Sequence, residues 1–103
     1  MYFVETSIFT KRIREVLSDD EYRMLQMKLV IHPDAGDIIK HSGGIRKLRW
    51  AGSGRGKRGG IRVIYFYYSE PDRIILLYVY PKNETEDLTS KQIKFLKSLI
   101  EED

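Results

Sequence analysis

The stretch IRVIYFYYSEPDRIILLYVY, residues 61–80, decides the fold of this chain. Its two halves, 61–68 and 73–80, are rich in the β-branched and aromatic residues that favour strands. Between them, Ser-Glu-Pro-Asp at 69–72 has the composition of a tight loop, so the stretch predicts a β-hairpin. Both faces of each strand are apolar. We therefore expect this hairpin to lie centrally in a sheet and to be covered on both sides.

Two further strands are predicted outside the hairpin. Residues 1–5 indicate a short strand at the N-terminus, and residues 45–50 alternate between two faces. One face of that strand carries Arg46, Leu48 and Trp50, and the other carries Ile45, Lys47 and Arg49.

Three helices complete the pattern. From Ser7 to about Leu17 apolar residues recur at helical spacing; a second helix starts at the capping box Ser18–Glu21 and ends before Pro33. The third helix starts at a capping box formed by Thr89 and Gln92. The order β-α-α-β-β-β-α predicts one α+β domain over residues 1–103, with a mainly antiparallel sheet, two N-terminal helices and a C-terminal helix.

Charge is unevenly distributed along the chain. The 18 basic and 15 acidic residues give a net charge of only +3, yet no acidic residue lies between Asp37 and Glu70. That interval holds the basic residues Lys40, Arg46, Lys47, Arg49, Arg55, Lys57, Arg58 and Arg62. Such segregation predicts a positive end that attracts a polyanion, or alternatively an acidic protein partner.

The chain has no cysteine, which excludes disulfides and thiolate chemistry and fits a reducing compartment. We find no signal-peptide pattern and no apolar run of membrane-spanning length, so we expect a cytoplasmic protein with no membrane partner.

A glycine-rich basic insert, GSGRGKRGG at 52–60, separates two of the predicted strands. Glycine offers nothing to bury and the cations repel one another, so we expect the insert to project into solvent and to be mobile. It is either a solvated turn or a loop in which Arg55, Lys57 and Arg58 grip a polynucleotide; basic residues in the flanking strands favour the second interpretation. The order of residues differs from that of a nucleotide-binding P-loop, and a strand follows where a P-loop has a helix.

The sequence shows no nucleophile beside a base, no carboxylate pair and no metal-ligand cluster, and we expect neither metal nor cofactor. His32 has a structural position beside Pro33; His41 is expected in solvent, with proton transfer as the alternative. RNA cleavage needs no protein nucleophile, because the RNA 2′-hydroxyl attacks the adjacent phosphate once cations align it and stabilise the transition state.

Several segments in order resemble the HigB-like branch of the RelE toxin superfamily. They are Ile45–Arg49 (IRKLR), the GRGKRGG insert, Ile61–Phe66 (IRVIYF), the strand around Ile75–Leu77, and Tyr80–Glu84 (YPKNE). The resemblance covers nearly the whole chain and implies a RelE-like fold. It implies a toxin of a type II toxin–antitoxin system that cleaves mRNA in the ribosomal A site without metal, leaves a cyclic phosphate, and is neutralised by an antitoxin.

The resemblance also implies roles for residues and partners. The catalytic residues carried over are Lys47, Arg49, Arg62 and Lys82, and the residues that contact RNA or the ribosome are Arg46, Arg55, Lys57 and Arg58. The implied partners are a helix-turn-helix antitoxin, mRNA and the 16S rRNA of the 70S ribosome, with operator DNA bound only through the antitoxin. Asn83 and Thr89 stand where relatives have an arginine and a tyrosine.

Two other functions fit the sequence. The same fold occurs in ParE-like inhibitors of DNA gyrase, which cleave nothing themselves. A non-catalytic RNA-binding module would use Trp50, Tyr65, Tyr67 and Tyr68 for stacking, although aromatic residues on a covered strand indicate a core. The cations on one strand face favour RNA cleavage over both alternatives.

Overall fold

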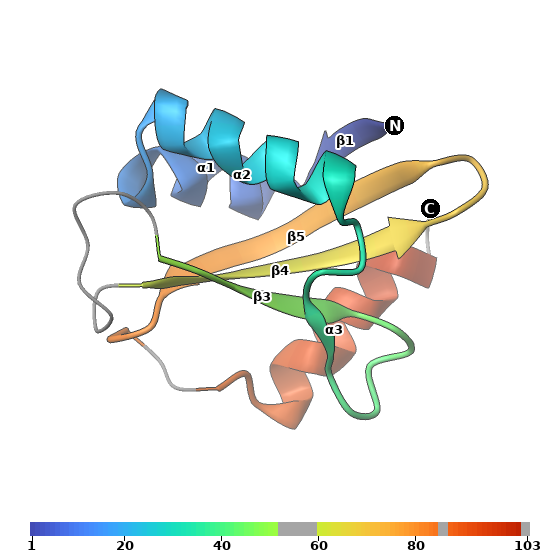
Figure 1. The fold of residues 1–103 in the computed structure, drawn as a ribbon. Coiled ribbons are helices and arrows are strands. Elements are labelled where there is room, and N and C mark those ends of the chain that lie inside the picture. Colours follow the sequence, from blue (N-terminus) through green and yellow to red (C-terminus); the bar gives the residue numbers. More distant parts are fainter. Residues whose placement is uncertain (52–59, 85–86, 102–103) are drawn as a thin grey trace.

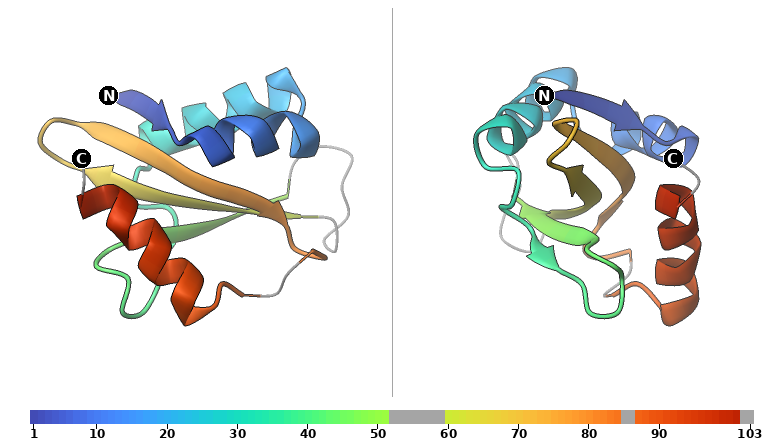
Figure 2. Two further views of the ribbon diagram at one scale, coloured as in Figure 1. Left: turned by 180° about the vertical axis from the view of Figure 1, so that it is seen from behind. Right: turned by 90° about the vertical axis from the view of Figure 1, so that its right-hand side faces the viewer.

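The computed structural model describes residues 1–51, 60–84 and 87–101. A five-stranded sheet separates two helices on one face from a third helix on the other (Figure 1; Figure 2). In chain order the elements are β1 (Tyr2–Glu5), α1 (Ser7–Val16), α2 (Asp19–Ile31), β2 (Asp37–Ile38), β3 (Arg46–Trp50), β4 (Ile61–Tyr68), β5 (Arg73–Pro81) and α3 (Ser90–Glu101).

The strand order in the sheet is β1-β5-β4-β3-β2, so the hairpin of β4 and β5 is central, as its apolar faces predicted. All neighbouring strands are antiparallel except β1 and β5. The predicted α+β class is therefore confirmed. The element order differs from the prediction by one strand, β2, whose two residues pair with Arg46 and Lys47 but are too few to show a period in the sequence.

The pairing of β4 with β5 contains a β-bulge. Tyr65 pairs with Leu76, but Ile64 pairs with Tyr78, so Leu77 is an extra residue on β5. Beyond the bulge, Arg62 is opposite Tyr80; an unbroken register would have placed Val79 there. Bulges are common beside functional sites because they redirect the side chains that follow.

Local sequence explains where the helices begin. Ser18 accepts a hydrogen bond from the backbone N–H of Glu21 at 3.2 Å, and the Glu21 carboxylate accepts one from the N–H of Ser18 at 3.4 Å. The same reciprocal bonds join Thr89 and Gln92 at the start of α3. Both predicted capping boxes are thus confirmed. Within the described ranges, every helix is too short or too polar to span a lipid bilayer.

Each face of the sheet has its own hydrophobic core. One face of the sheet packs against α1 and α2 through Phe9, Ile13, Leu25 and Leu29. The other face packs against α3 through Leu96, which belongs to a second cluster of buried residues. This second cluster contains Ile45, Ile64, Ile75, Leu77, Tyr80 and Leu96. Burying one such large apolar side chain stabilises the fold by about 1.5–3 kcal/mol. Membership of one core or the other therefore shows which face of the sheet each strand residue belongs to.

Candidate active site

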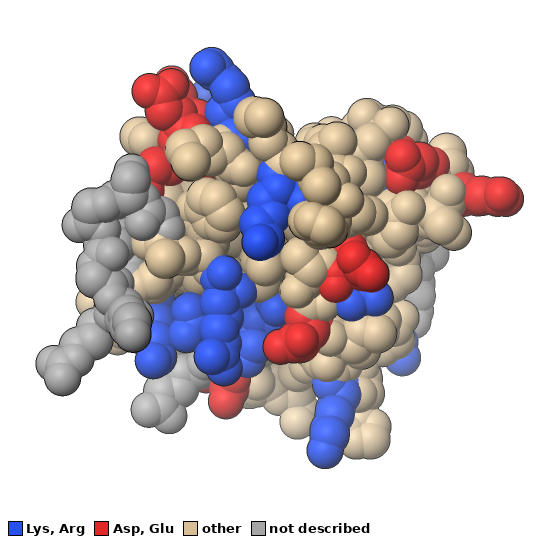
Figure 3. Space-filling model, viewed as in Figure 1, with Lys and Arg blue, Asp and Glu red and all other residues tan. Residues whose placement is uncertain are grey.

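The sheet places the predicted catalytic cations of β3 and β4 on the face that α3 covers. Leu48 and Trp50 pack with α1 and α2, so Lys47 and Arg49, which alternate with them, belong to the opposite face. Arg62 lies between Ile61 and Val63, which both belong to the core under α1 and α2. Arg62 is therefore on the opposite face, the α3 face, together with Ile64. Figure 3 shows Lys and Arg atoms in the largest charged patch of that view, beside the residues whose placement is uncertain.

The register brings two arginines together. Arg49 of β3 is the direct cross-strand partner of Arg62 in β4, and Arg62 is in turn opposite Tyr80 in β5. These three residues form one row across the sheet, and Lys47 lies in the adjacent row. Directly opposed side chains have Cβ atoms about 4.5–5.5 Å apart, within reach of a single phosphate group.

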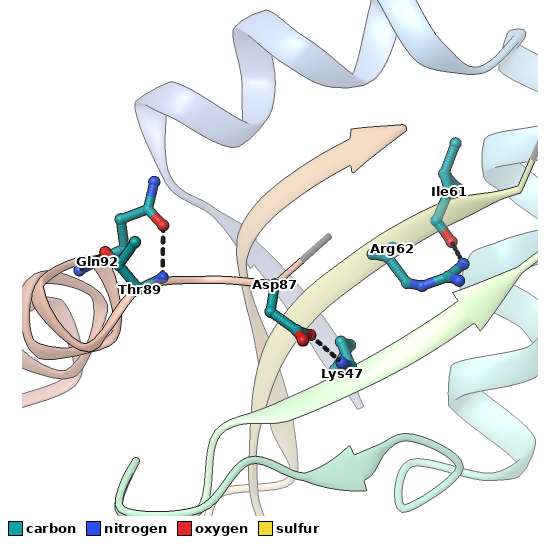
Figure 4. Close-up of polar contacts among 6 residues, drawn as sticks. All are labelled: Lys47, Ile61, Arg62, Asp87, Thr89 and Gln92. Atoms are coloured by element: carbon teal, nitrogen blue, oxygen red, sulfur yellow. Dashed lines mark hydrogen bonds and ion pairs between the residues drawn. The ribbon is translucent and has the colours of Figure 1, made fainter. Parts of the chain in front are cut away.

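Arg62 is a buried cation. Only 9% of its surface is exposed, and its Nη1 donates to the carbonyl oxygen of Ile61 at 3.3 Å (Figure 4). Among the described residues no carboxylate lies within ion-pair distance of it. A buried guanidinium without an acidic partner destabilises the folded state by roughly several kcal/mol unless a bound anion compensates for the lost hydration. Arg62 therefore has the environment of an anion-binding residue.

Tyr80 contributes a buried hydroxyl to the same row. The residue is fully buried, and its hydroxyl oxygen has no hydrogen-bond partner among the described residues. Burial raises the pKa of this phenol, the charge of Asp87 raises it further, and the charge of Arg62 acts against both. The Tyr80 hydroxyl therefore stays protonated at neutral pH.

Lys82 lies at the same end of the sheet, just past β5. Its backbone N–H donates to the carbonyl oxygen of Gly60 at 3.0 Å, which ties the turn after β5 to the residue before β4. A second tie comes from α1, where Arg12 Nη2 donates to both carboxylate oxygens of Glu84, at 2.8 and 2.7 Å. Lys82 is thus carried by a turn that is held from two sides, and its own side chain is exposed.

Asp87 makes an ion pair with Lys47, with 3.1 Å between Oδ1 and Nζ (Figure 4). Acidic residues just before a helix, such as Glu84 and Asp87, often complement the helix dipole. The structure differs, because α3 has no acidic residue in its first turn and the two carboxylates bind Arg12 and Lys47 instead. Neither Asp87 nor Tyr80 was expected at the site from sequence.

The remaining predicted site residues lie elsewhere. Arg46 belongs to the opposite face of β3, where its Nη1 donates to the carbonyl oxygens of Gly36 at 2.7 Å and Asp34 at 3.3 Å. These bonds give Arg46 a structural task in holding the loop before β2. The basic insert, with Arg55, Lys57 and Arg58, lies outside the described residues. Its expected mobility therefore stays a prediction.

Comparison with known proteins shows the family of this chain. The family model of the "RelE toxin of RelE / RelB toxin-antitoxin system" matches residues 4–102. The solved structure of a double arginine-to-alanine mutant of the E. coli toxin RelE in the free state superposes with a TM-score of 0.60 over 96% of this chain and 95% of that one, at 15% identity. That likeness concerns the fold alone.

A curated protein is similar to part of the chain. The nitrogen fixation nifHD region GlnB-like protein 1 of Methanobacterium ivanovii is 30% identical over 69 residues, 63% of this chain. The match spans 66% of that protein, just under two thirds of its length. The family match covers nearly all of the present chain and includes every strand that carries the cationic face. The chain therefore belongs to the RelE toxin family, whose members are the toxins of type II toxin–antitoxin systems.

Proposed function

We propose that this toxin is an endoribonuclease that cleaves mRNA on the ribosome, with the RNA 2′-hydroxyl as nucleophile. Such activity is typical of the family. The observation that carries the proposal is the buried Arg62, which has no acidic partner in the described residues and stands directly opposite Arg49. Two guanidinium groups in one row match the oxygens of a phosphate in a way that a folding role does not require.

The proposed roles follow from position. Arg62 and Arg49 stabilise the negative charge that grows on the phosphoryl oxygens when the 2′-oxygen attacks phosphorus. Lys47 and Lys82 lie in the next row and at the adjoining turn, from which their ammonium groups neutralise neighbouring phosphate oxygens and the departing 5′-oxygen. Preorganised charges of this kind each contribute on the order of 10²- to 10³-fold in rate. The products are a 2′,3′-cyclic phosphate and a 5′-hydroxyl.

The proposal extends to the partners of the toxin. It acts in the cytoplasm on mRNA in the ribosomal A site, and Arg55, Lys57 and Arg58 of the basic insert contact 16S rRNA. A helix-turn-helix antitoxin neutralises it and alone contacts operator DNA. The resemblance of the motifs RKLR, GKRGG and YPKNE supports the proposal that it belongs to the HigB-like branch.

The test is cleavage of mRNA by purified toxin on programmed ribosomes, with products mapped by primer extension. We expect cuts within translated codons. Arg62→Ala and the bulkier Arg62→Gln should both lower cleavage by about 100-fold or more, because neither keeps the cation. Lys28→Ala, on the exposed side of α2, is the matched control and should leave cleavage unchanged.

Three outcomes would contradict the proposal or its site. Full activity of a folded Arg62→Gln variant would remove Arg62 from the site. Intact message together with damaged chromosomal DNA would instead indicate gyrase inhibition, and intact message with tight RNA binding would indicate a non-catalytic module. Thermal unfolding of each variant shows whether a loss of cleavage reflects a loss of fold.

A further inference from the structure

The ion pair between Asp87 and Lys47 places a carboxylate on the cationic face. The two residues are 40 positions apart in sequence, and Asp87 reaches β3 from the segment that leads into α3 (Figure 4). The side chain of Asp87 is 78% exposed, whereas that of Lys47 is 26% exposed. The carboxylate therefore lies on the solvent side of the ammonium group, where an incoming anion must approach.

Cations and a second carboxylate are neighbours of Lys47 in the sheet. Arg49 is two residues further along the same strand, and Arg62 lies diagonally across on β4. Asp37 of β2 is the cross-strand partner of Lys47 on its other side. Within the described residues, however, the only carboxylate in ion-pair contact with Lys47 is that of Asp87. Asp87 thus neutralises the one lysine of β3 that borders the arginine row.

We propose that Asp87 occupies, on Lys47, the position that a backbone phosphate of the RNA takes. Binding of RNA then exchanges an intramolecular ion pair for an intermolecular one, and Asp87 is a specificity-determining residue. Asp87 then lowers the affinity for single strands that make few other contacts with the protein. A strand that is bound at several points displaces the carboxylate from Lys47. This inference rests on the proposed function, because it takes RNA as the polyanion.

The expected size of the effect is modest. An exposed ion pair contributes little, so its removal should tighten binding of a single strand by roughly two- to fivefold. The salt dependence should also become steeper. In the unmodified protein the displaced Asp87 takes up a cation, which offsets part of the counterion release that accompanies each phosphate contact. Without the carboxylate that offset disappears.

The experiment measures fluorescence anisotropy of a labelled single-stranded 2′-O-methyl RNA, a probe that the toxin cannot cleave. We compare the full chain with Asp87→Asn across a series of salt concentrations. The matched control is Asp20→Asn, which makes the same change in net charge and also breaks an exposed ion pair, 3.9 Å to Arg23, but on α2 across the sheet. Asp87→Asn should tighten binding by two- to fivefold relative to this control.

A double-mutant cycle then assigns the effect to Lys47. In a Lys47→Gln background, Asp87→Asn should tighten binding no more than Asp20→Asn does, because the exchanged ion pair is gone. Equal effects of Asp87→Asn and Asp20→Asn in the unmodified background would overturn the inference, as would weaker binding by Asp87→Asn. Since the probe cannot be cleaved, these binding results are independent of the cleavage assay. If the toxin cleaves no mRNA but the mutant cycle gives the expected affinities, the proposed nuclease activity is wrong and Asp87 still competes with phosphate for Lys47.

Discussion

Arg49 of β3 and Arg62 of β4 are direct cross-strand partners on one face of the sheet. Like charges in this relationship are destabilising, so the sheet retains an unfavourable pair of residues. The pair stands at the end of β4 where the bulge has also redirected Tyr80 towards the row. Functional sites often reduce the stability of a fold, and this relationship is the physical argument for a candidate site at this pair.

Arg49→Thr should stabilise the protein. Threonine favours strands and removes the repulsion on Arg62, so we expect the free energy of unfolding to rise by about 0.2–1 kcal/mol at low salt. The gain should shrink at high salt, where exposed charges are screened. Urea unfolding at two salt concentrations measures it. Arg49→Lys keeps the charge and is the control; a loss of stability in Arg49→Thr at low salt would contradict the prediction. Cleavage should fall in Arg49→Thr.

The link between Arg12 and Glu84 should couple α1 to the turn that carries Lys82. One guanidinium nitrogen contacts both carboxylate oxygens at 2.8 Å or less, and the side chains are 24% and 47% exposed. A double-mutant cycle with Arg12→Gln and Glu84→Gln should give a coupling of about 0.5–1 kcal/mol. The cycle of Asp20 and Arg23, whose charged atoms are 3.9 Å apart, should give almost none. Similar couplings for both pairs would show that the Glu84 contact has no special weight.

Tyr22 should make stability depend on alkaline pH. Burial raises the pKa of its phenol, and so does Glu5, whose carboxylate accepts a hydrogen bond from the hydroxyl at 2.6 Å. The folded state therefore holds this proton more tightly than the unfolded state does. The stabilisation is fully present below the ordinary tyrosine pKa of about 10, and it is lost as the pH rises above 10 towards the higher folded pKa.

Tyr22→Phe tests that dependence. Its unfolding free energy should fall less steeply above pH 10 than that of the unmodified protein, in chemical denaturation followed at several pH values. Tyr2→Phe, at an exposed tyrosine of β1, is the control and should leave the slope unchanged. Parallel slopes for the Tyr22→Phe variant and the unmodified protein would contradict the assignment.

Much of the fold follows from local patterns in the sequence. The apolar hairpin of 61–80, the alternation in 45–50 and the capping boxes at Ser18 and Thr89 each depend on residues close together in the chain. Alternation also assigns Lys47 and Arg49 to one face of β3, because the period of a strand is two. The class of the domain and the face of the candidate site were therefore predictable.

The remaining features depend on residues far apart, and no period encodes them. Without the bulge at Leu77, the hairpin register would have put Val79 rather than Tyr80 opposite Arg62. The ion pair of Asp87 with Lys47 spans 40 residues, and that of Glu84 with Arg12 spans 72. Acidic residues just before a helix usually complement its dipole, so local patterns alone would assign both carboxylates to α3. Tertiary contacts decided otherwise.

Tyr65→Phe should destabilise the protein. The buried hydroxyl donates to the carbonyl oxygen of Pro33 at 2.7 Å and accepts a bond from the N–H of Gly36 at 2.9 Å. Removing it leaves two backbone groups without partners, at a cost of about 1–3 kcal/mol. The melting temperature should fall accordingly. A variant as stable as the unmodified protein would mean that these bonds add nothing to the link between β4 and the loop after α2.

Tyr80→Phe should stabilise the protein, in contrast to the same substitution at Tyr65 of the same sheet. Here the hydroxyl is equally buried but has no partner in the described residues, so folding strips it of water without replacing the lost hydrogen bonds. Phenylalanine removes that cost, and we expect the free energy of unfolding to rise by up to about 1 kcal/mol. Tyr65→Phe is the matched control, because both variants delete one oxygen from a fully buried ring. A fall in stability of Tyr80→Phe as large as that of Tyr65→Phe would show that the Tyr80 hydroxyl is bonded in solution and would remove it from the candidate site as an unsatisfied group.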